Sequence, residues 1–113
     1  MAAADSFEIS PREVTHLQKS GKLISLIDVR EPNEWAVSHL EGASLVPMNT
    51  VPANLQFLEG QADSSDLIVY CHHGVRSLQV VAWLREKGIE NCLSMTGGID
   101  RWSLEIDPNV PRY

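Results

Sequence analysis

A cysteine between an apolar run and a glycine-containing loop is the residue pattern with the clearest chemical potential in this sequence. Residues 67–70 are apolar and partly β-branched, which predicts a buried strand. The strand leads to Cys71, and the loop 72–77 leads into a segment with helical spacing of apolar residues that ends before Gly88. Cys71 is therefore predicted between the carboxyl end of a strand and the amino end of a helix, where open α/β sheets bind ligands.

The loop after Cys71 predicts an anion site. The free N–H groups and the positive dipole end of a helix attract negative charge, so the cysteine is expected as a reactive thiolate rather than an inert thiol. Successive N–H groups from Cys71 to Ser77 are expected to form a nest around an anionic sulfur. Gly74 lets the backbone curl, Arg76 either braces the loop or meets an anionic donor, and Ser77 either caps the helix or bonds the cysteine sulfur.

Short strands that alternate with short helices must position this loop. The pattern predicts an α/β fold with a mainly parallel central sheet flanked by helices on both faces, as one domain over residues 1–113. Strands are expected at residues 7–9, 23–27, 43–46, 67–70 and 92–95. Helices are expected at residues 11–20, 31–37, 49–58 and 78–87 and after Gly97-Gly98, with a surface loop at 60–66.

Composition excludes several classes of function. The net charge of −6, with no basic run, argues against nucleic acid as a partner. No apolar run reaches the length of a membrane helix, and Met1–Asp5 lacks the basic and apolar regions of a signal peptide. Cys71 and Cys92 do not resemble a secreted disulfide framework. A reducing, cytoplasmic location without membrane attachment is expected.

Four motifs in order along the chain resemble the signatures of a single rhodanese domain. They are Asp-Val-Arg-Glu-Pro-Asn-Glu-Trp at 28–35, His-Leu-Glu-Gly-Ala at 39–43, Tyr-Cys-His-His-Gly-Val-Arg-Ser at 70–77 and Gly-Gly-Ile-Asp-Arg-Trp at 97–102. The resemblance implies the rhodanese fold and a sulfurtransferase that needs no cofactor. It also implies that Cys71 carries sulfur as a persulfide, taken from thiosulfate or a persulfidated protein and passed to a thiol or cyanide.

Two other functions use a similar loop. Cysteine-dependent phosphatases and arsenate reductases place five residues between cysteine and arginine, whereas residues 72–75 are only four, which favours a smaller pocket suited to one sulfur. A non-catalytic rhodanese-like binding module is the alternative from a different class. Such modules usually lose the cysteine, and this chain keeps Cys71.

Residue 72 departs from the pattern of active thiosulfate users, which often have Arg or Lys directly after the cysteine. His72 is mostly neutral at pH 7, so it attracts a dianion less than a fixed cation does, and a protein persulfide becomes an alternative donor. Cys71, His72 and His73 are not expected to bind a metal, because adjacent side chains in a tight loop diverge and no second ligand cluster is suitably spaced.

Structural roles are predicted for the other candidate residues. Asp28 and Arg30 are expected as a hydrogen-bonded or paired couple near the pocket, and His39 as a half-buried structural histidine. Core positions are predicted for Cys92, Trp35, Trp83 and Trp102.

Overall fold

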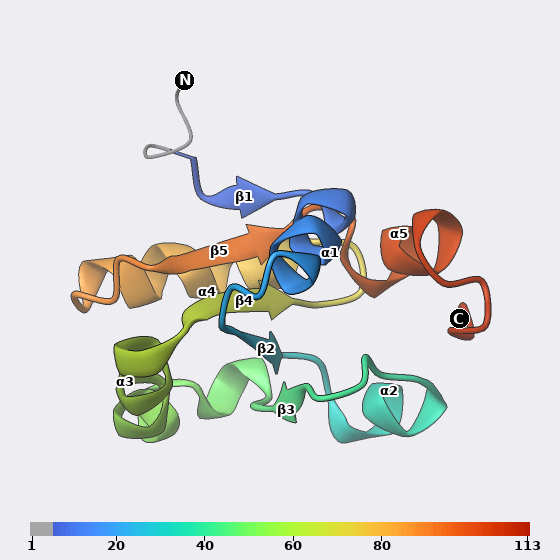
Figure 1. The fold of residues 1–113 in the computed structure, drawn as a ribbon. Coiled ribbons are helices and arrows are strands. Elements are labelled where there is room, and N and C mark those ends of the chain that lie inside the picture. Colours follow the sequence, from blue (N-terminus) through green and yellow to red (C-terminus); the bar gives the residue numbers. More distant parts are fainter. Residues whose placement is uncertain (1–5) are drawn as a thin grey trace.

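The computed structural model describes residues 6–113 and has a central sheet of five parallel strands (Figure 1). The strands are β1 (Glu8–Ile9), β2 (Ile24–Asp28), β3 (Ser44–Leu45), β4 (Asp66–Tyr70) and β5 (Cys92–Met95). Their order across the sheet is β1-β5-β4-β2-β3, so β4 is central and pairs with both β2 and β5. The predicted α/β fold with a parallel sheet is confirmed.

Helices cover both faces of this sheet (Figure 1). The helices are α1 (Pro11–Lys19), α2 (Pro32–Val37), α3 (Leu55–Ser64), α4 (Val75–Glu86) and α5 (Gly98–Glu105), with 3-10 turns η2 (Met48–Thr50) and η3 (Pro52–Asn54). Leu58 of α3 and Val81 of α4 are buried in a core on one face of the sheet. Val14 of α1 and Ile99 of α5 are buried in a second core on the other face.

Two of the predicted elements are wrong, and the start of a third is displaced. Residues 49–58 are not one helix but two 3-10 turns followed by α3, and residues 60–66 are not a surface loop, because α3 continues to Ser64. The helix tolerates Gly60, whose Cα faces open space, and it ends where the Ser65 hydroxyl donates to the Gln61 carbonyl. Helix α4 begins at Val75, three residues before the predicted start.

The predicted core residues fall into two groups. Cys92 and Trp102 are buried as predicted, and Trp83 packs partly buried against the core. The prediction that Trp35 is a core residue is wrong, because Trp35 is only half-buried and lies outside both cores. His39 is exposed rather than half-buried, but it has the predicted structural contacts: its Nδ1 lies 3.0 Å from the Trp35 carbonyl oxygen, and its ring stacks on that of Trp35 with centroids 3.8 Å apart. The short helix α2 has no fully buried residue, and Trp35 on it is only half-buried.

The carboxyl ends of the parallel strands meet at one edge of the sheet, where α2 and α5 also lie (Figure 1). The residues that follow β2, β4 and β5 are therefore brought together there. Within residues 6–113, no helix is both long and apolar enough to cross a membrane. Residues 1–5, on which the prediction of no signal peptide rests, lie outside the described residues.

Candidate active site

Cys71 follows the last residue of β4, and its side chain is almost completely buried, with 1% exposed. The Sγ atom accepts hydrogen bonds from the backbone N–H groups of Gly74 at 3.1 Å and Ser77 at 3.3 Å. The thiol also donates to the Ser77 hydroxyl at 3.4 Å, and that hydroxyl lies 2.7 Å from the hydroxyl of Ser94 on β5. Backbone donors and a hydroxyl therefore surround the sulfur, an arrangement that stabilises negative charge on it.

The other N–H groups of the loop make no hydrogen bond within residues 6–113. Those of His72, His73, Val75 and Arg76 have no acceptor among the residues that the structure describes. The first N–H groups of any helix lack intrahelical partners, and α4 begins at Val75. The loop can therefore offer further donors to an anion attached to the Cys71 sulfur.

The glycine pair at the start of α5 packs directly against this loop. The N–H of Ile99 donates to the Cys71 carbonyl at 2.9 Å, and the N–H of Asp100 donates to the His72 carbonyl at 3.2 Å. Gly98 has φ +61°, and a Cβ at this position would lie 2.4 Å from the Cys71 carbonyl oxygen. The predicted turn at Gly97-Gly98 is confirmed, and glycine is required there because the two backbones touch.

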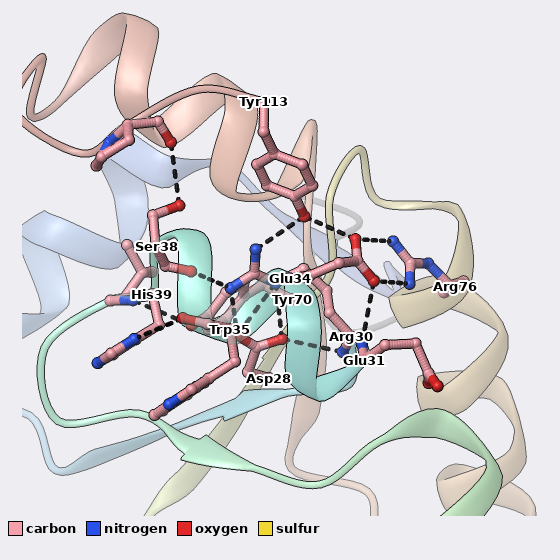
Figure 2. Close-up of polar contacts among 12 residues, drawn as sticks. Asp28, Arg30, Glu31, Glu34, Trp35, Ser38, His39, Tyr70, Arg76 and Tyr113 are labelled. Atoms are coloured by element: carbon pink, nitrogen blue, oxygen red, sulfur yellow. Dashed lines mark hydrogen bonds and ion pairs between the residues drawn. The ribbon is translucent and has the colours of Figure 1, made fainter.

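Arg76 braces the loop rather than reaching toward the sulfur. Its guanidinium makes a two-point ion pair with Glu34 of α2, at 2.7 and 3.0 Å (Figure 2). These hydrogen bonds lower the pKa of Glu34 to about 2, although partial burial acts in the opposite direction. Of the two roles considered for Arg76, the geometry favours bracing. Ser77 was expected either to cap the helix or to bond the cysteine sulfur. The geometry favours the contact with the sulfur, because Gly74 occupies the N-cap position of α4.

Asp28 and Arg30 form a fully buried ion pair at the end of β2 (Figure 2). Arg30 donates to both Asp28 carboxylate oxygens, to the Ser38 carbonyl and to the Tyr113 hydroxyl. Burial alone would lower the pKa of Arg30, but the hydrogen bonds to Asp28 and Tyr113 outweigh it and raise the pKa. The predicted paired, structural role of these residues is confirmed.

The remaining loop side chains lie at the rim. His73 and Val75 are exposed, with Val75 68% exposed, and the His73 Nδ1 lies 3.9 Å from the Asp100 carboxylate. His72 is half-buried, and its ring lies 3.9 Å from that of His73 and 3.9 Å from that of Tyr113. Burial lowers the pKa of His72, and the nearby charge of His73 lowers it further.

Tyr113 is the site neighbour that sequence reasoning missed. It lies 41 positions after His72 in the sequence, and no periodicity or motif connects the two. Among residues 6–113, no group of three or more His, Cys, Asp or Glu side chains is arranged to hold a metal ion.

The fold and the loop define the class to which this protein belongs. Residues 10–105 match the family model described as the rhodanese-like domain, so the chain is a member of the rhodanese-like family. Its fold is also that of a rhodanese-like domain protein from Staphylococcus aureus. The TM-score is 0.78 at 28% sequence identity, over 94% of this chain and 97% of that one.

Curated relatives include both short and long proteins. The chain is 39% identical over 95 residues to thiosulfate sulfurtransferase GlpE of Haemophilus influenzae. The aligned region covers 84% of this chain and 86% of GlpE. It is 32% identical over 111 residues to the probable adenylyltransferase/sulfurtransferase MoeZ of Mycobacterium tuberculosis. This aligned region covers 98% of this chain and 28% of MoeZ. The chain therefore spans about a quarter of the length of some relatives and most of the length of others.

Proposed function

We propose that this chain is a sulfurtransferase in which Cys71 carries a sulfane sulfur as a persulfide. One observation carries the proposal: the Cys71 Sγ accepts hydrogen bonds from the backbone N–H groups of both Gly74 and Ser77. These donors favour the thiolate, which is the nucleophilic form of cysteine. The sulfurtransferase names of relatives such as GlpE support the same activity.

Sulfur transfer at this site needs two displacements. The Cys71 thiolate attacks the outer sulfur of thiosulfate, a new S–S bond forms, and the old S–S bond breaks with its electron pair leaving on sulfite. A persulfide donor reacts in the same way and releases a thiolate. An acceptor thiolate or cyanide then attacks the outer sulfur of the Cys71 persulfide, and the Cys71 thiolate is regenerated. No general base is required once the cysteine is ionised.

Residues 72–77 are proposed as the substrate-binding loop. The N–H groups of His72, His73, Val75 and Arg76, which have no acceptor within residues 6–113, supply hydrogen bonds to the anionic outer sulfur. Arg76 acts through its ion pair with Glu34, which fixes the loop. The reaction needs no metal or other cofactor, because the cysteine itself carries the transferred group.

The proposal also covers the setting of the domain. Residues 1–113 function as one rhodanese domain with a small-molecule donor or a persulfidated protein as partner, and with neither nucleic acid nor membrane. Cys71 must stay reduced between turnovers, which a cytoplasmic location provides. The four residues between Cys71 and Arg76 favour a single sulfur over a tetrahedral oxyanion.

Steady-state assays with thiosulfate and cyanide test this function, with thiocyanate as the measured product. The unaltered protein and Cys92→Ala are expected to form thiocyanate, because Cys92 is buried opposite Leu67, near the start of β4, whereas the loop follows the end of that strand. Cys71→Ser should form none. The same preparations should leave an aryl phosphate and arsenate unchanged.

Three results would contradict the proposal. Thiocyanate formation by Cys71→Ser would move the nucleophile elsewhere. Hydrolysis of the aryl phosphate or reduction of arsenate by the unaltered protein would favour oxyanion chemistry. Absence of product with thiosulfate and with a persulfidated protein donor would favour a binding module.

A further inference from the structure

The ring of Tyr113 lies flat on the ring of His72, beside the Cys71 loop. The two ring centroids are 3.9 Å apart and the ring planes differ by 7°. The other neighbour of the imidazole, His73, has its ring centroid at the same distance but tilted by 30°. Tyr113 therefore provides the better-aligned contact and removes part of the imidazole from water.

The Tyr113 hydroxyl is held by two charged side chains, one between β2 and α2 and one on α2. It accepts a hydrogen bond from Arg30 at 2.8 Å and donates one to Glu34 at 2.7 Å (Figure 2). Arg30 is fully buried and bound to Asp28, so it is a fixed anchor. Glu34 is the same residue that holds Arg76, so one carboxylate joins the tyrosine to the loop.

The residues just before Tyr113 are also fastened to the site edge. The Ser38 hydroxyl donates to the Pro111 carbonyl at 3.0 Å. The Arg112 guanidinium pairs with Asp100 of α5 at 2.8 Å. These contacts do not involve the tyrosine hydroxyl, so a phenylalanine at position 113 should keep the ring in place.

We propose that Tyr113 is a positioning residue that determines donor specificity by stacking on His72 and keeping the mouth of the loop free of an unpaired cation. With His72 partly covered by Tyr113 and Arg76 paired to Glu34, a donor meets a neutral imidazole and a neutralised guanidinium. Thiosulfate, a dianion, gains little attraction there, and donors with less negative charge, such as persulfides, are favoured. This inference rests on the proposed sulfur transfer.

The charged surroundings of His72 set the direction of the pH effect. The titratable and charged groups that face it are His73 on the loop, Glu34 on α2, Arg76 on α4, Asp100 on α5 and Tyr113. His73 and Arg76 oppose protonation of His72, and Glu34 and Asp100 favour it, so their effects partly cancel. Burial is the largest cause of the lowered pKa of His72. Removing the Tyr113 ring restores water and should raise that pKa toward its ordinary value of about 6.5.

The test compares the Michaelis constant for thiosulfate between about pH 8 and about pH 6 in three proteins: unaltered, Tyr113→Phe and Tyr113→Ala. At the lower pH, the Tyr113→Ala protein should carry a protonated His72 and have a Michaelis constant about three- to tenfold lower, relative to the unaltered protein at the same pH. At the higher pH, the two proteins should differ much less. Tyr113→Phe should follow the unaltered protein, because it keeps the ring.

A double variant, Tyr113→Ala with His72→Gln, should not show the lowered Michaelis constant for thiosulfate at the lower pH, because it has no imidazole to protonate. An NMR titration of His72 supplies a readout independent of turnover, in which Tyr113→Ala raises the pKa of His72 and Tyr113→Phe does not. A purely structural tyrosine would change stability or turnover without this pH-dependent split of the Michaelis constant.

The outcomes separate this inference from the proposed function. If the unaltered protein formed no persulfide on Cys71, the proposed function would fail, and the titration would still decide whether Tyr113 controls His72. Identical pH profiles of the Michaelis constant in all three proteins, with normal persulfide formation, would overturn the inference alone. An equal drop in the Michaelis constant for thiosulfate at the lower pH in Tyr113→Phe and Tyr113→Ala would also overturn it. Loss of the aromatic ring would then not be what changes thiosulfate binding.

Discussion

At the scale of single residues, the two cysteines are both buried but lie in different surroundings. The Cys92 sulfur is fully buried among apolar side chains, and burial raises the pKa of its thiol. Cys71 is just as buried, but its sulfur accepts hydrogen bonds from the backbone N–H groups of Gly74 and Ser77. Burial alone therefore does not distinguish them, and the backbone donors do.

Residue 72 allows a direct test of charge at the mouth of the loop. His72→Arg places a permanent cation there, and attraction of the thiosulfate dianion should lower the Michaelis constant more than it changes the turnover number. The gain should shrink with added salt, because an exposed charge is screened over about 10 Å at 0.1 M. Steady-state kinetics with thiosulfate and cyanide at low and high ionic strength measure both effects. An unchanged Michaelis constant would mean that residue 72 does not meet the donor.

Part of the site could be read from residue types, and part could not. The positions of Cys71 and Gly74 were predictable, because a strand, a short loop and a helix are local patterns that place N–H groups around a sulfur. The role of the Ser77 side chain stayed open between helix cap and sulfur contact until the geometry placed Gly74 at the N-cap of α4. The role of Arg76 stayed open because its partner, Glu34, lies 42 positions earlier in the chain. Tyr113 was missed because its contacts depend entirely on tertiary packing.

At the scale of elements, the start of α5 determines the shape of the Cys71 loop. The N–H groups of Ile99 and Asp100 donate to the Cys71 and His72 carbonyls, and Gly98 has no room for a side chain. The sequence motif at Gly97-Gly98 predicted a turn, but only the pairing of β4 with β5 brings that turn against the loop. Local sequence patterns do not contain this information.

Gly98→Ala tests the brace. The new Cβ would meet the Cys71 and His72 carbonyl oxygens at 2.4 Å, so the loop must shift, and both sulfur transfer and stability should fall, the latter by about 2 kcal/mol or more. Gly88→Ala is the matched control, since Gly88 also has a positive φ, of +97°, but open space around it. It should lose about 1 kcal/mol and keep normal transfer.

Thermal unfolding and thiocyanate formation, measured on both glycine variants, give the comparison. Equal activity loss in Gly88→Ala and Gly98→Ala would mean that general destabilisation, not contact with the loop, causes the defect. Full sulfur-transfer activity in Gly98→Ala would mean that the start of α5 does not determine the shape of the Cys71 loop.

The prediction of elements succeeded where local signals agreed and failed where they conflicted. Ser10 and Glu13 form the predicted capping box of α1 in the structure, and Pro11 is the first helical residue. By contrast, Gly60 and its polar neighbours suggested a loop, whereas α3 continues through them because Leu58 anchors the helix in the core. Tertiary packing overrides weak helix propensity at such positions.

At the scale of the whole molecule, the parallel sheet brings four distant segments to one edge. The segments are α2 with Glu34, the loop after β4, the start of α5 and the residues up to Tyr113 (Figures 1 and 2). Because all strands run in the same direction, every strand end that carries a site residue meets the others. The cysteine loop is thus held from both sides by elements that are far apart in sequence.

The central claim is that Cys71 becomes the carrier of a transferred sulfur, and intact mass spectrometry tests it most directly. After treatment with thiosulfate, the protein should gain the mass of one sulfur atom, and cyanide should remove it. Cys71→Ser should show no gain, whereas Cys92→Ala should behave like the unaltered protein. Retention of the adduct in Cys71→Ser, or its loss in a folded Cys92→Ala protein, would contradict the account.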